Sequence, residues 1–196
     1  MARAQQQGSG GERTLVLTET GVAEEGTDTD EVVISISAGF NELKDETLAG
    51  ERHAAVLREM MAGIEEEGIT SRVVRFTDTL DLGVIGLRGA RLSGSGIAIG
   101  IQTRGTTLIH QAELVPLSNL ELFPQAPLID LETFRAIGRN AALYAKGESP
   151  EPVPVGNDPM ARPKYQALAA LWHIKEMEYT DEERAPTELT VSFEER

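Results

Sequence analysis

The sequence contains no cysteine, and this absence removes several classes of protein at once. Without thiols there is no disulfide, no cysteine-ligated zinc, no iron–sulfur cluster and no thiol nucleophile. No apolar run approaches the roughly 18 residues that a membrane span needs. Residues 1–11 are rich in glutamine and glycine and have no apolar core, so no secretory signal is expected. We therefore expect a cytoplasmic protein that makes no membrane contact.

Positive charge is also scarce, because 18 Lys and Arg stand against 32 Asp and Glu, which gives a net charge of −14. Binding to a phosphate backbone depends on Lys and Arg that displace counterions, so no nucleic-acid partner is expected. Acidic residues gather at both ends of the chain. Such ends are typical of solvated, mobile segments. We predict a flexible acidic N-terminal segment over 1–30 and an acidic tail over 179–196.

Between these ends, the apolar pattern predicts an α/β domain over residues 31–147. A β-branched run at 32–36 is typical of a buried strand, and apolar residues three to four apart predict a helix over 51–67 that ends at Gly68. Further strands are predicted over 71–76, 83–87, 97–102 and 106–110. Strand, helix and strand within about 45 residues form a βαβ unit, which favours a mostly parallel sheet flanked by helices.

Residues 148–178 are predicted to form a proline-rich arm followed by a C-terminal helix. Before them, Asp130 is a suitable N-cap for a helix that runs to about Lys146. Five prolines between 148 and 163 favour an extended arm close to polyproline II. Pro163 suits the first turn of the last helix, whose core-facing side chains are predicted to be Tyr165, Leu168, Leu171 and Trp172.

An apolar segment from 114 to 129 is unusual because three prolines interrupt it. The prolines exclude regular structure, yet its leucines and Phe123 are too apolar for an open loop. Such a segment either packs on its own domain or is covered by a ligand or another subunit. Both alternatives stay open from the residues alone.

Common catalytic patterns are absent from the sequence. Glycines from 94 to 100 have the spacing G-x-G-x-x-x-G and lead into a strand, so a turn is favoured over a dinucleotide site. His53, His110 and His173 have no second ligand nearby in the sequence, so no metal site is predicted unless the fold brings two of them together. There is no Gly-x-Ser-x-Gly elbow, P-loop or His-Glu-x-x-His. We expect no catalytic residue in this chain.

Four segments are long enough to be specific for one protein family. They read LREMMAGIEEEGITSRVVR, RLSGSGIAIGIQTRGTTLIHQ, PLSNLELFPQAPL and NDPMARPKYQA. These segments closely resemble the medium (β) subunit of the adenosylcobalamin-dependent diol and glycerol dehydratases, propanediol dehydratase among them. The resemblance runs from about residue 30 to residue 178 and is poor only over 39–50. It implies a Rossmann-like α/β domain that forms one wall of a cobalamin site.

The resemblance also implies an assembly with large and small subunits, two of each, and contact with a reactivating factor. In the family, the large subunit is a TIM barrel that holds the substrate and a metal ion. Homolysis of the cobalt–carbon bond gives an adenosyl radical, and a 1,2-diol or glycerol is converted to an aldehyde with loss of water. This chain would then bind the cofactor without carrying the reacting groups.

Four cobalamin contacts of the family fall on residues of this sequence, namely Asp81, Arg104, Asn119 and Pro124. Asp and Asn suit the peripheral amides of cobalamin, Arg suits its phosphate, and Pro offers the ring a dry surface. The family has Lys where this sequence has Arg104, which keeps the charge and changes the reach. From the residues alone, Asp81 also suits a turn cap, Arg104 a hairpin tip, and Asn119 a loop-stabilising role. The pattern Asp-x-His-x-x-Gly is absent, which implies a cofactor bound with its own base on cobalt.

Two other functions stand beside this hypothesis. The small subunit of a dehydratase-reactivating factor shares the fold, but it is shorter and is expected to lack both residues 117–125 and the proline-rich arm. An independent nucleotide-binding protein would depend on the glycine cluster alone. Some relatives of the medium subunit begin with an amphipathic helix that directs them into a protein-shelled microcompartment. Residues 1–11 lack the apolar side chains of such a helix, so this targeting is not expected.

Overall fold

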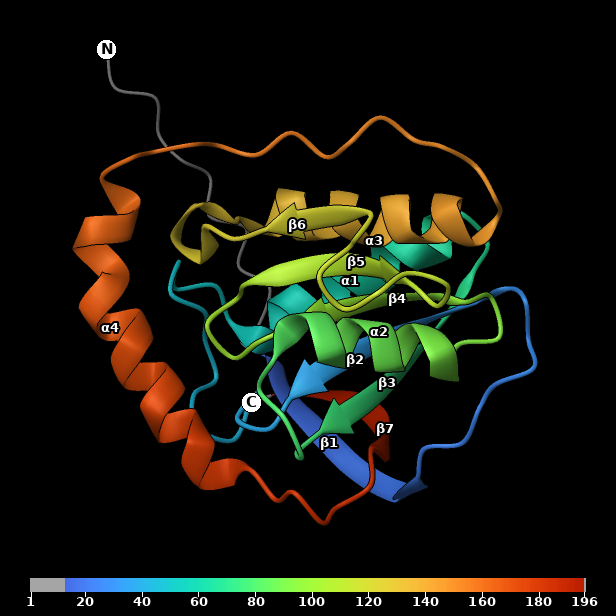
Figure 1. The fold of residues 1–196 in the computed structure, drawn as a ribbon, viewed down its shortest axis with the longest axis horizontal. Coiled ribbons are helices and arrows are strands. Elements are labelled where there is room, and N and C mark those ends of the chain that lie inside the picture. The colour runs from blue at the N-terminus through green and yellow to red at the C-terminus, as the bar shows by residue number, and fades with distance from the viewer. Residues whose placement is uncertain (1–12, 196) are drawn as a thin grey trace.

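The computed structural model describes residues 13–195, which form one seven-stranded sheet with helices against it (Figure 1). The strands lie in the order β1-β7-β3-β2-β4-β5-β6. Their bounds are β1 (Arg13–Val22), β2 (Glu31–Ser37), β3 (Thr70–Phe76), β4 (Ile97–Ile101), β5 (Thr107–Gln111), β6 (Glu121–Phe123) and β7 (Thr187–Glu195). The helices are α1 (His53–Glu66), α2 (Leu82–Leu92), α3 (Leu131–Ala145) and α4 (Ala161–Glu176), with short 3-10 turns at Ala126–Leu128 and Met177–Tyr179.

Among the seven strands of residues 13–195, parallel pairing is limited to β2 with β3 and β2 with β4. The pairs β1–β7, β3–β7, β4–β5 and β5–β6 are antiparallel. The predicted α/β fold is confirmed, but the prediction of a mostly parallel sheet is wrong. Only β2, β3 and β4 are joined through crossover helices, whereas a short hairpin joins β4 to β5 and therefore reverses the chain.

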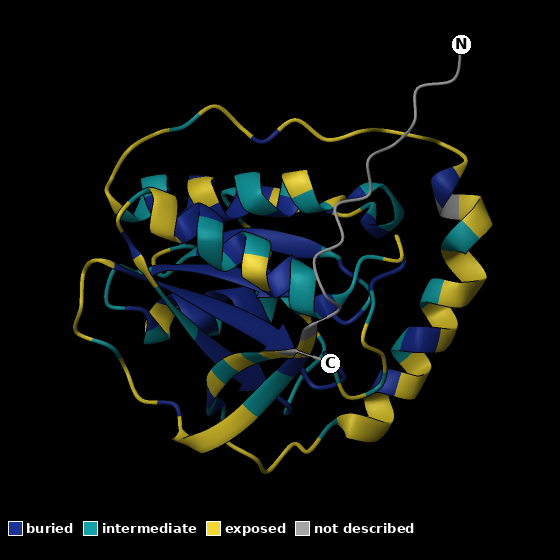
Figure 2. Ribbon diagram, turned by 180° about the vertical axis from the view of Figure 1, so that it is seen from behind, coloured by how far each residue is buried: buried dark blue, intermediate teal, exposed yellow. Residues whose placement is uncertain are grey.

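Alternate residues of the central strand serve opposite faces of the sheet. Val32, Ile34 and Ile36 of β2 pack in the core that includes α1 and α3, whereas Val33 packs in a second core with α2. Figure 2 shows the central strands buried on the two faces that these helices cover. The two-sided burial explains why residues 32–34 of the strand are apolar without alternation, as the sequence indicated.

Residues 83–87, which were predicted as a strand, lie in α2. Asp81 caps this helix, since its Oδ1 accepts a hydrogen bond from Val84 N at 3.1 Å. Gly86 and Gly89 face the sheet so closely that added methyl groups would overlap the side chains of Leu108 and Ser35. The glycines therefore allow the helix to pack tightly on the sheet. Because glycine has a low helix propensity, they also made residues 83–87 look unlike a helix in the sequence.

The two ends of the chain form part of the sheet. Residues 13–22, within the predicted flexible segment 1–30, and residues 187–195, within the predicted acidic tail 179–196, pair as β1 and β7. Their alternating apolar side chains explain this: Leu15 and Leu189 are buried in the larger core, and Phe193 packs against it. The prediction of mobile ends is thus wrong for these stretches, because apolar alternation outweighs acidic charge. Its remainder over 1–12 lies outside the described residues.

The helix predicted after Asp130 is confirmed as α3, with Thr133 N donating to Asp130 Oδ1 at 2.8 Å. The arm that follows is held by Glu121 of β6, which is buried and accepts from Val153 N at 2.8 Å. Helix α4 then runs along one side of the molecule, apart from α1 to α3 (Figure 1). Within residues 13–195, no helix combines the length and hydropathy needed to cross a bilayer.

Helix α4 is less buried than the sequence predicted. Trp172 is buried, as expected, and packs with Leu48 and Ala126. Leu168 and Leu171, predicted to face the core, are 40% and 49% exposed. Figure 2 shows most of this helix in the exposed colour. The helix therefore lies on the domain through a narrow strip, and its other apolar side chains are uncovered.

Candidate functional site

The predicted site residues lie at or beside the edge of the sheet where β2, β3 and β4 end. Because these strands are parallel, their carboxyl ends meet at one edge, which is where ligands bind in open α/β sheets. The β4–β5 hairpin lies at the same edge. Strand β6 also ends there, because Phe123 pairs with Thr107 at the start of β5. We call this side of the sheet the carboxyl edge.

Arg104 lies in the β4–β5 hairpin at the carboxyl edge, next to Gly105, whose φ of +96° permits the turn. Its Nε donates to Thr106 Oγ1 at 3.0 Å, and its carbonyl accepts from Leu48 N at 3.0 Å. Burial lowers the pKa of the guanidinium, and the nearby Glu176 partly offsets this. The ion pairs formed among residues 13–195 do not include Arg104, so the charge of this half-buried guanidinium is compensated only in part, by the nearby Glu176.

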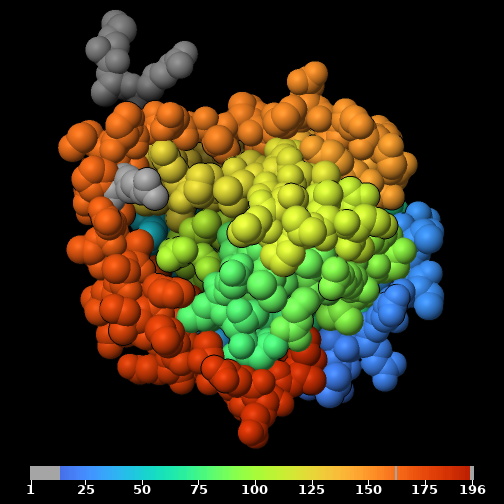
Figure 3. Space-filling model, in the orientation of Figure 1, coloured from blue at the N-terminus to red at the C-terminus, as the bar shows by residue number. Residues whose placement is uncertain are grey.

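Pro124 lines the same cavity as Arg104. This cavity has a volume of about 580 Å³ and lies between the hairpin, the segment after β6 and helix α4. Leu48, Ala126, Tyr165 and Ala169 contribute to its largely apolar walls. In Figure 3 the hollow opens between the orange-to-red α4 and the yellow and green residues of the carboxyl edge.

Asp81 lies at the N-terminus of α2 and is exposed. Its role as a helix cap, one of the alternatives from the sequence, is confirmed by the bond from Val84 N. Its second carboxylate oxygen, Oδ2, accepts no hydrogen bond within the described part of the chain. A cap and a ligand contact are compatible, since a carboxylate has two oxygens and about four acceptor positions.

Asn119 lies in the loop that packs against the start of α2. A methyl group on Gly83 would overlap the carbonyl of Pro116 and lie 3.3 Å from Asp81 Oδ1. The loop that contains Asn119 is therefore next to Asp81. The side-chain amide of Asn119 makes no hydrogen bond to any residue from 13 to 195, so it does not stabilise its loop in the way that the sequence alone allowed.

The apolar segment 114–129 is divided between core and surface. Phe123 and Ile129 are buried in the larger core, whereas Leu117 is 92% exposed and Leu122 and Val115 are also exposed. Packing on its own domain is thus confirmed for the buried part of the segment, and coverage of the exposed part by a ligand or another subunit stays a prediction. The exposed part lies beside Asn119 and offers an apolar surface to something outside this chain.

The structure places Arg104 and Pro124 together, and it places Asp81 beside the loop that contains Asn119. Arg104 and Pro124 share a cavity, and Asp81 shares the Gly83 contact with the loop of Asn119. The two places are linked by Gln102 at the base of the hairpin, whose Nε2 donates to Leu80 O at 2.7 Å. The cavity itself does not include Asp81 or Asn119.

His53 supports the hairpin from beneath. It is fully buried and stacked on Phe40 with ring centroids 3.9 Å apart. Its Nδ1 accepts from Asn41 N at 3.1 Å, which assigns the proton to Nε2, 2.8 Å from Thr103 O. Burial lowers the pKa of His53 to about 4, so the ring is neutral at pH 7. Among residues 13–195, no group of three His, Cys, Asp or Glu could hold a metal ion.

Sequence reasoning missed the polar cluster at the end of β2. Ser37, Thr103 and Glu176 are all buried there and contact one another. Glu176 lies in the last turn of α4, where a carboxylate is normally solvated. Only the three-dimensional arrangement shows that the domain surrounds it with donors.

The fold and the carboxyl edge define an α/β protein with a candidate binding surface. The family described as the dehydratase medium subunit matches residues 38–151, which is more than half of the chain and includes all four predicted contacts. The chain belongs to this family, and the resemblance seen in the sequence is confirmed. It is therefore one subunit of a multi-subunit dehydratase and has partner subunits.

Two solved structures are similar in fold to part of the chain. One is described as a glycerol dehydratase reactivase, with 18% identity and a TM-score of 0.48, and the match covers 64% of this chain and 95% of that one. The other is a diol dehydratase-reactivating factor complexed with ADP and Mg2+, with 24% identity, a TM-score of 0.47, and coverage of 61% and 94%.

Proposed function

We propose that this subunit forms one wall of an adenosylcobalamin site in a diol or glycerol dehydratase, through Asp81, Arg104, Asn119 and Pro124. The family match makes the chain a dehydratase subunit. The observation that supports the cofactor is Arg104, a half-buried guanidinium outside the ion pairs of the described chain, on the wall of a cavity that Pro124 also lines. A cation in this position suits the phosphate of the nucleotide loop of cobalamin.

The other residues fit the remaining chemistry of a corrinoid. The Asn119 amide and Asp81 Oδ2 have no hydrogen-bonding partner in the described chain and suit the peripheral amides of the ring. Pro124 and the exposed Leu117 and Leu122 give the ring an apolar surface. The cavity of about 580 Å³ is smaller than a corrinoid, so the ring would extend over the open edge and meet a second wall supplied by another subunit.

When bound, adenosylcobalamin supplies a radical that starts the dehydration of a 1,2-diol or glycerol to an aldehyde. In our proposal, this chain binds and orients the cofactor, and the reacting groups belong to the large subunit. The proposed assembly has two large, two medium and two small subunits, and a reactivating factor is a further partner.

The proposal is tested by co-expression with the large and small dehydratase subunits. Arg104→Ala and Asn119→Ala should each raise the apparent KM for adenosylcobalamin by about 5–150-fold, because a hydrogen bond to a charged or buried group contributes about 1–3 kcal/mol. Arg91→Ala is the matched control, since Arg91 is exposed in the last turn of α2, at the opposite edge of the sheet. Unchanged cofactor affinity in both site variants would remove the site assignment.

The same preparation tests the family-level role. The chain should co-purify with the large and small subunits, and aldehyde formation should require it. ATP-dependent release of damaged cobalamin by this chain and a partner would instead support the reactivating factor, the alternative from the sequence.

A further inference from the structure

Glu176 is the last residue of α4 and is only 3% exposed, although it carries a carboxylate. Its Oε1 accepts hydrogen bonds from Ser37 Oγ, from Thr103 Oγ1 at 2.6 Å and from Gly39 N at 3.2 Å. A buried carboxylate is tolerated when donors replace its hydration, and here three donors converge on a single oxygen. The domain thus solvates one oxyanion at this place.

The three donors do not depend on α4 for their positions. Ser37 ends β2, Gly39 follows it, and Thr103 lies in the hairpin after β4, the neighbouring strand. Thr103 N donates to Ser37 Oγ at 3.1 Å, which leaves the serine proton to point at the carboxylate. Arg104 adds positive charge beside them, since its pKa responds to Glu176. The arrangement is an anion site built by the sheet and its loops.

The helix that supplies Glu176 is held by few contacts. Among the side chains of α4 that the structure describes, only those of Ala161, Trp172 and Glu176 are buried. A carboxylate at the C-terminal end of a helix is also opposed by the helix macrodipole. Glu176 is therefore kept in place by the donors of the sheet and by Trp172, not by a broad helix interface.

We propose that Ser37, Gly39 and Thr103 form an anion-binding site, which Glu176 fills in this state and which a ligand with a carboxylate or phosphate group occupies when α4 lifts from the carboxyl edge. Lifting α4 also opens the adjacent cavity, because Tyr165 and Ala169 of that helix form one of its walls. The inference goes beyond the proposed function, and its test uses small anions and the isolated chain without cobalamin.

The first experiment empties the site by Glu176→Ala and refills it with acetate or inorganic phosphate. At an anion concentration tenfold above its dissociation constant, the midpoint of thermal unfolding should rise by about 3–6 °C more than in chloride of equal ionic strength. Glu176→Gln is the matched control, because its amide oxygen still fills the site and competes with the added anion, so its unfolding midpoint should rise less than that of Glu176→Ala. Ser37→Ala in the Glu176→Ala background should weaken anion binding at least tenfold.

Equal shifts in wild type, Glu176→Gln and Glu176→Ala would overturn the anion site. If Glu176→Ala does not fold in chloride, its refolding yield in acetate or phosphate replaces the melting experiment. Native circular dichroism recovered only in an oxyanion supports the site, and equal recovery in chloride refutes it. Stronger rescue by acetate than by phosphate assigns the site to carboxylates, and the reverse assigns it to phosphates.

The second experiment tests displacement through Trp172, the only tryptophan in the sequence. In the wild type, the rescuing anion should shift the Trp172 emission to the red and increase its quenching by acrylamide, both saturably. Glu176→Gln should respond at about tenfold lower anion concentration, because a neutral amide competes less well than a carboxylate for the donors. An unchanged Trp172 signal in the wild type and in Glu176→Gln would show that Glu176 permanently holds α4 on the domain, and it would refute displacement.

Discussion

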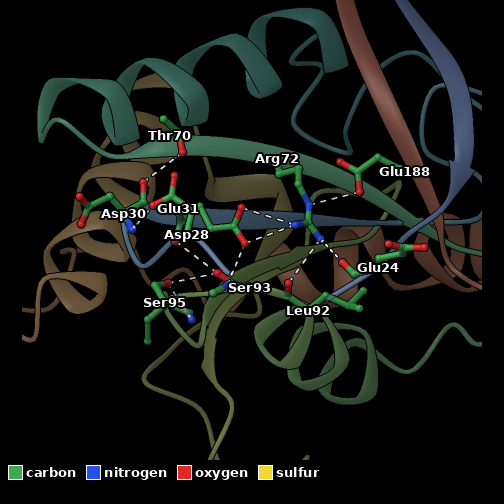
Figure 4. A network of polar contacts seen from close by, with 12 residues as sticks. Glu24, Asp28, Asp30, Glu31, Thr70, Arg72, Leu92, Ser93, Ser95 and Glu188 are labelled. Atoms are coloured by element: carbon green, nitrogen blue, oxygen red, sulfur yellow. Dashed lines mark hydrogen bonds and ion pairs between the residues drawn. The ribbon is translucent and has the colours of Figure 1, made fainter. Parts of the chain in front are cut away.

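Arg72 is the centre of the polar network in Figure 4, and Arg72→Met is predicted to destabilise the fold by about 3–5 kcal/mol. Its Nη1 lies 3.3 Å from Glu31 Oε1, its Nε lies 3.2 Å from Glu188 Oε2, and its Nη2 donates to Glu24 O at 2.7 Å. These contacts join β3 to β2, to β7 and to the segment after β1. Met keeps much of the volume of the side chain and removes the charge, so buried Glu31 loses its cation.

The size of the loss depends on what still compensates Glu31. Gly94 N continues to donate to Glu31 Oε1 at 2.7 Å, so we expect about 3 kcal/mol, the lower end of the range. Burial already raises the pKa of Glu188, and the loss of Arg72 removes the charge that lowers it. An acid with a raised folded-state pKa favours unfolding as the pH rises through that pKa. The difference in the free energy of unfolding between the wild type and Arg72→Met should therefore be largest near pH 7. It should shrink as the pH falls toward the usual pKa of Glu, about 4.3.

Urea unfolding followed by far-ultraviolet circular dichroism measures this difference. Arg139→Met is the matched control, since Arg139 pairs with Glu66 on the surface, at 2.9 Å, and loss of this solvent-screened pair should destabilise the fold far less than loss of Arg72. Glu31→Gln in the Arg72→Met background should recover part of the stability, because it removes the uncompensated charge. A loss of stability in Arg72→Met no larger than in Arg139→Met, or no recovery by Glu31→Gln, would contradict a stabilising role of the Arg72–Glu31 pair.

Two further predictions concern packing and pH. Gly138→Ala in α3 should cost about 1–3 kcal/mol, because its methyl group would overlap the Met60 carbonyl of α1; Ala136→Gly is a control for helix propensity, and an equally small loss in both variants would contradict the close crossing. The stability should fall by about 3 kcal/mol as the pH drops from 6.5 to 4, because His53 has a folded-state pKa of about 4 and the unfolded chain takes up the proton first. His53→Asn should remove this component from urea unfolding measured across the pH range, and an identical pH slope in this variant would exclude His53 as its source.

Local patterns predicted the elements whose side chains face one core with a regular period. Helices α1 and α3 have apolar residues at helical spacing, and each ends near a glycine with positive φ, Gly68 and Gly147. Strand β2 has the consecutive apolar residues Val32, Val33 and Ile34 because helices cover both faces of it. In these elements the residues within one turn or one strand carry the information, so a single sequence is enough.

The errors have a different physical origin, since they depend on partners far along the chain. The acidic ends were assigned to solvent by charge, but β1 and β7 pair with each other across some 170 residues and with the core through alternating leucines. The glycines of α2 weakened its helical pattern, although they are there because Leu108 and Ser35 leave no room for a side chain. The direction of strand pairing was likewise set by connections that the βαβ unit does not determine.

For the candidate site, too, some residues could be predicted from the sequence and others depend on contacts between distant parts of the chain. The sequence resemblance selected Arg104 and Pro124, but only the fold shows that they line one cavity with α4. Glu176 could not be found by pattern, because its donors Ser37 and Thr103 lie 139 and 73 residues away. Its burial at a helix C-terminus opposes the local electrostatic preference, and such conflicts are expected where structure serves function. A buried carboxylate that opposes the helix dipole, and whose Oε1 nevertheless accepts three hydrogen bonds, is therefore the place where a change of state is best sought.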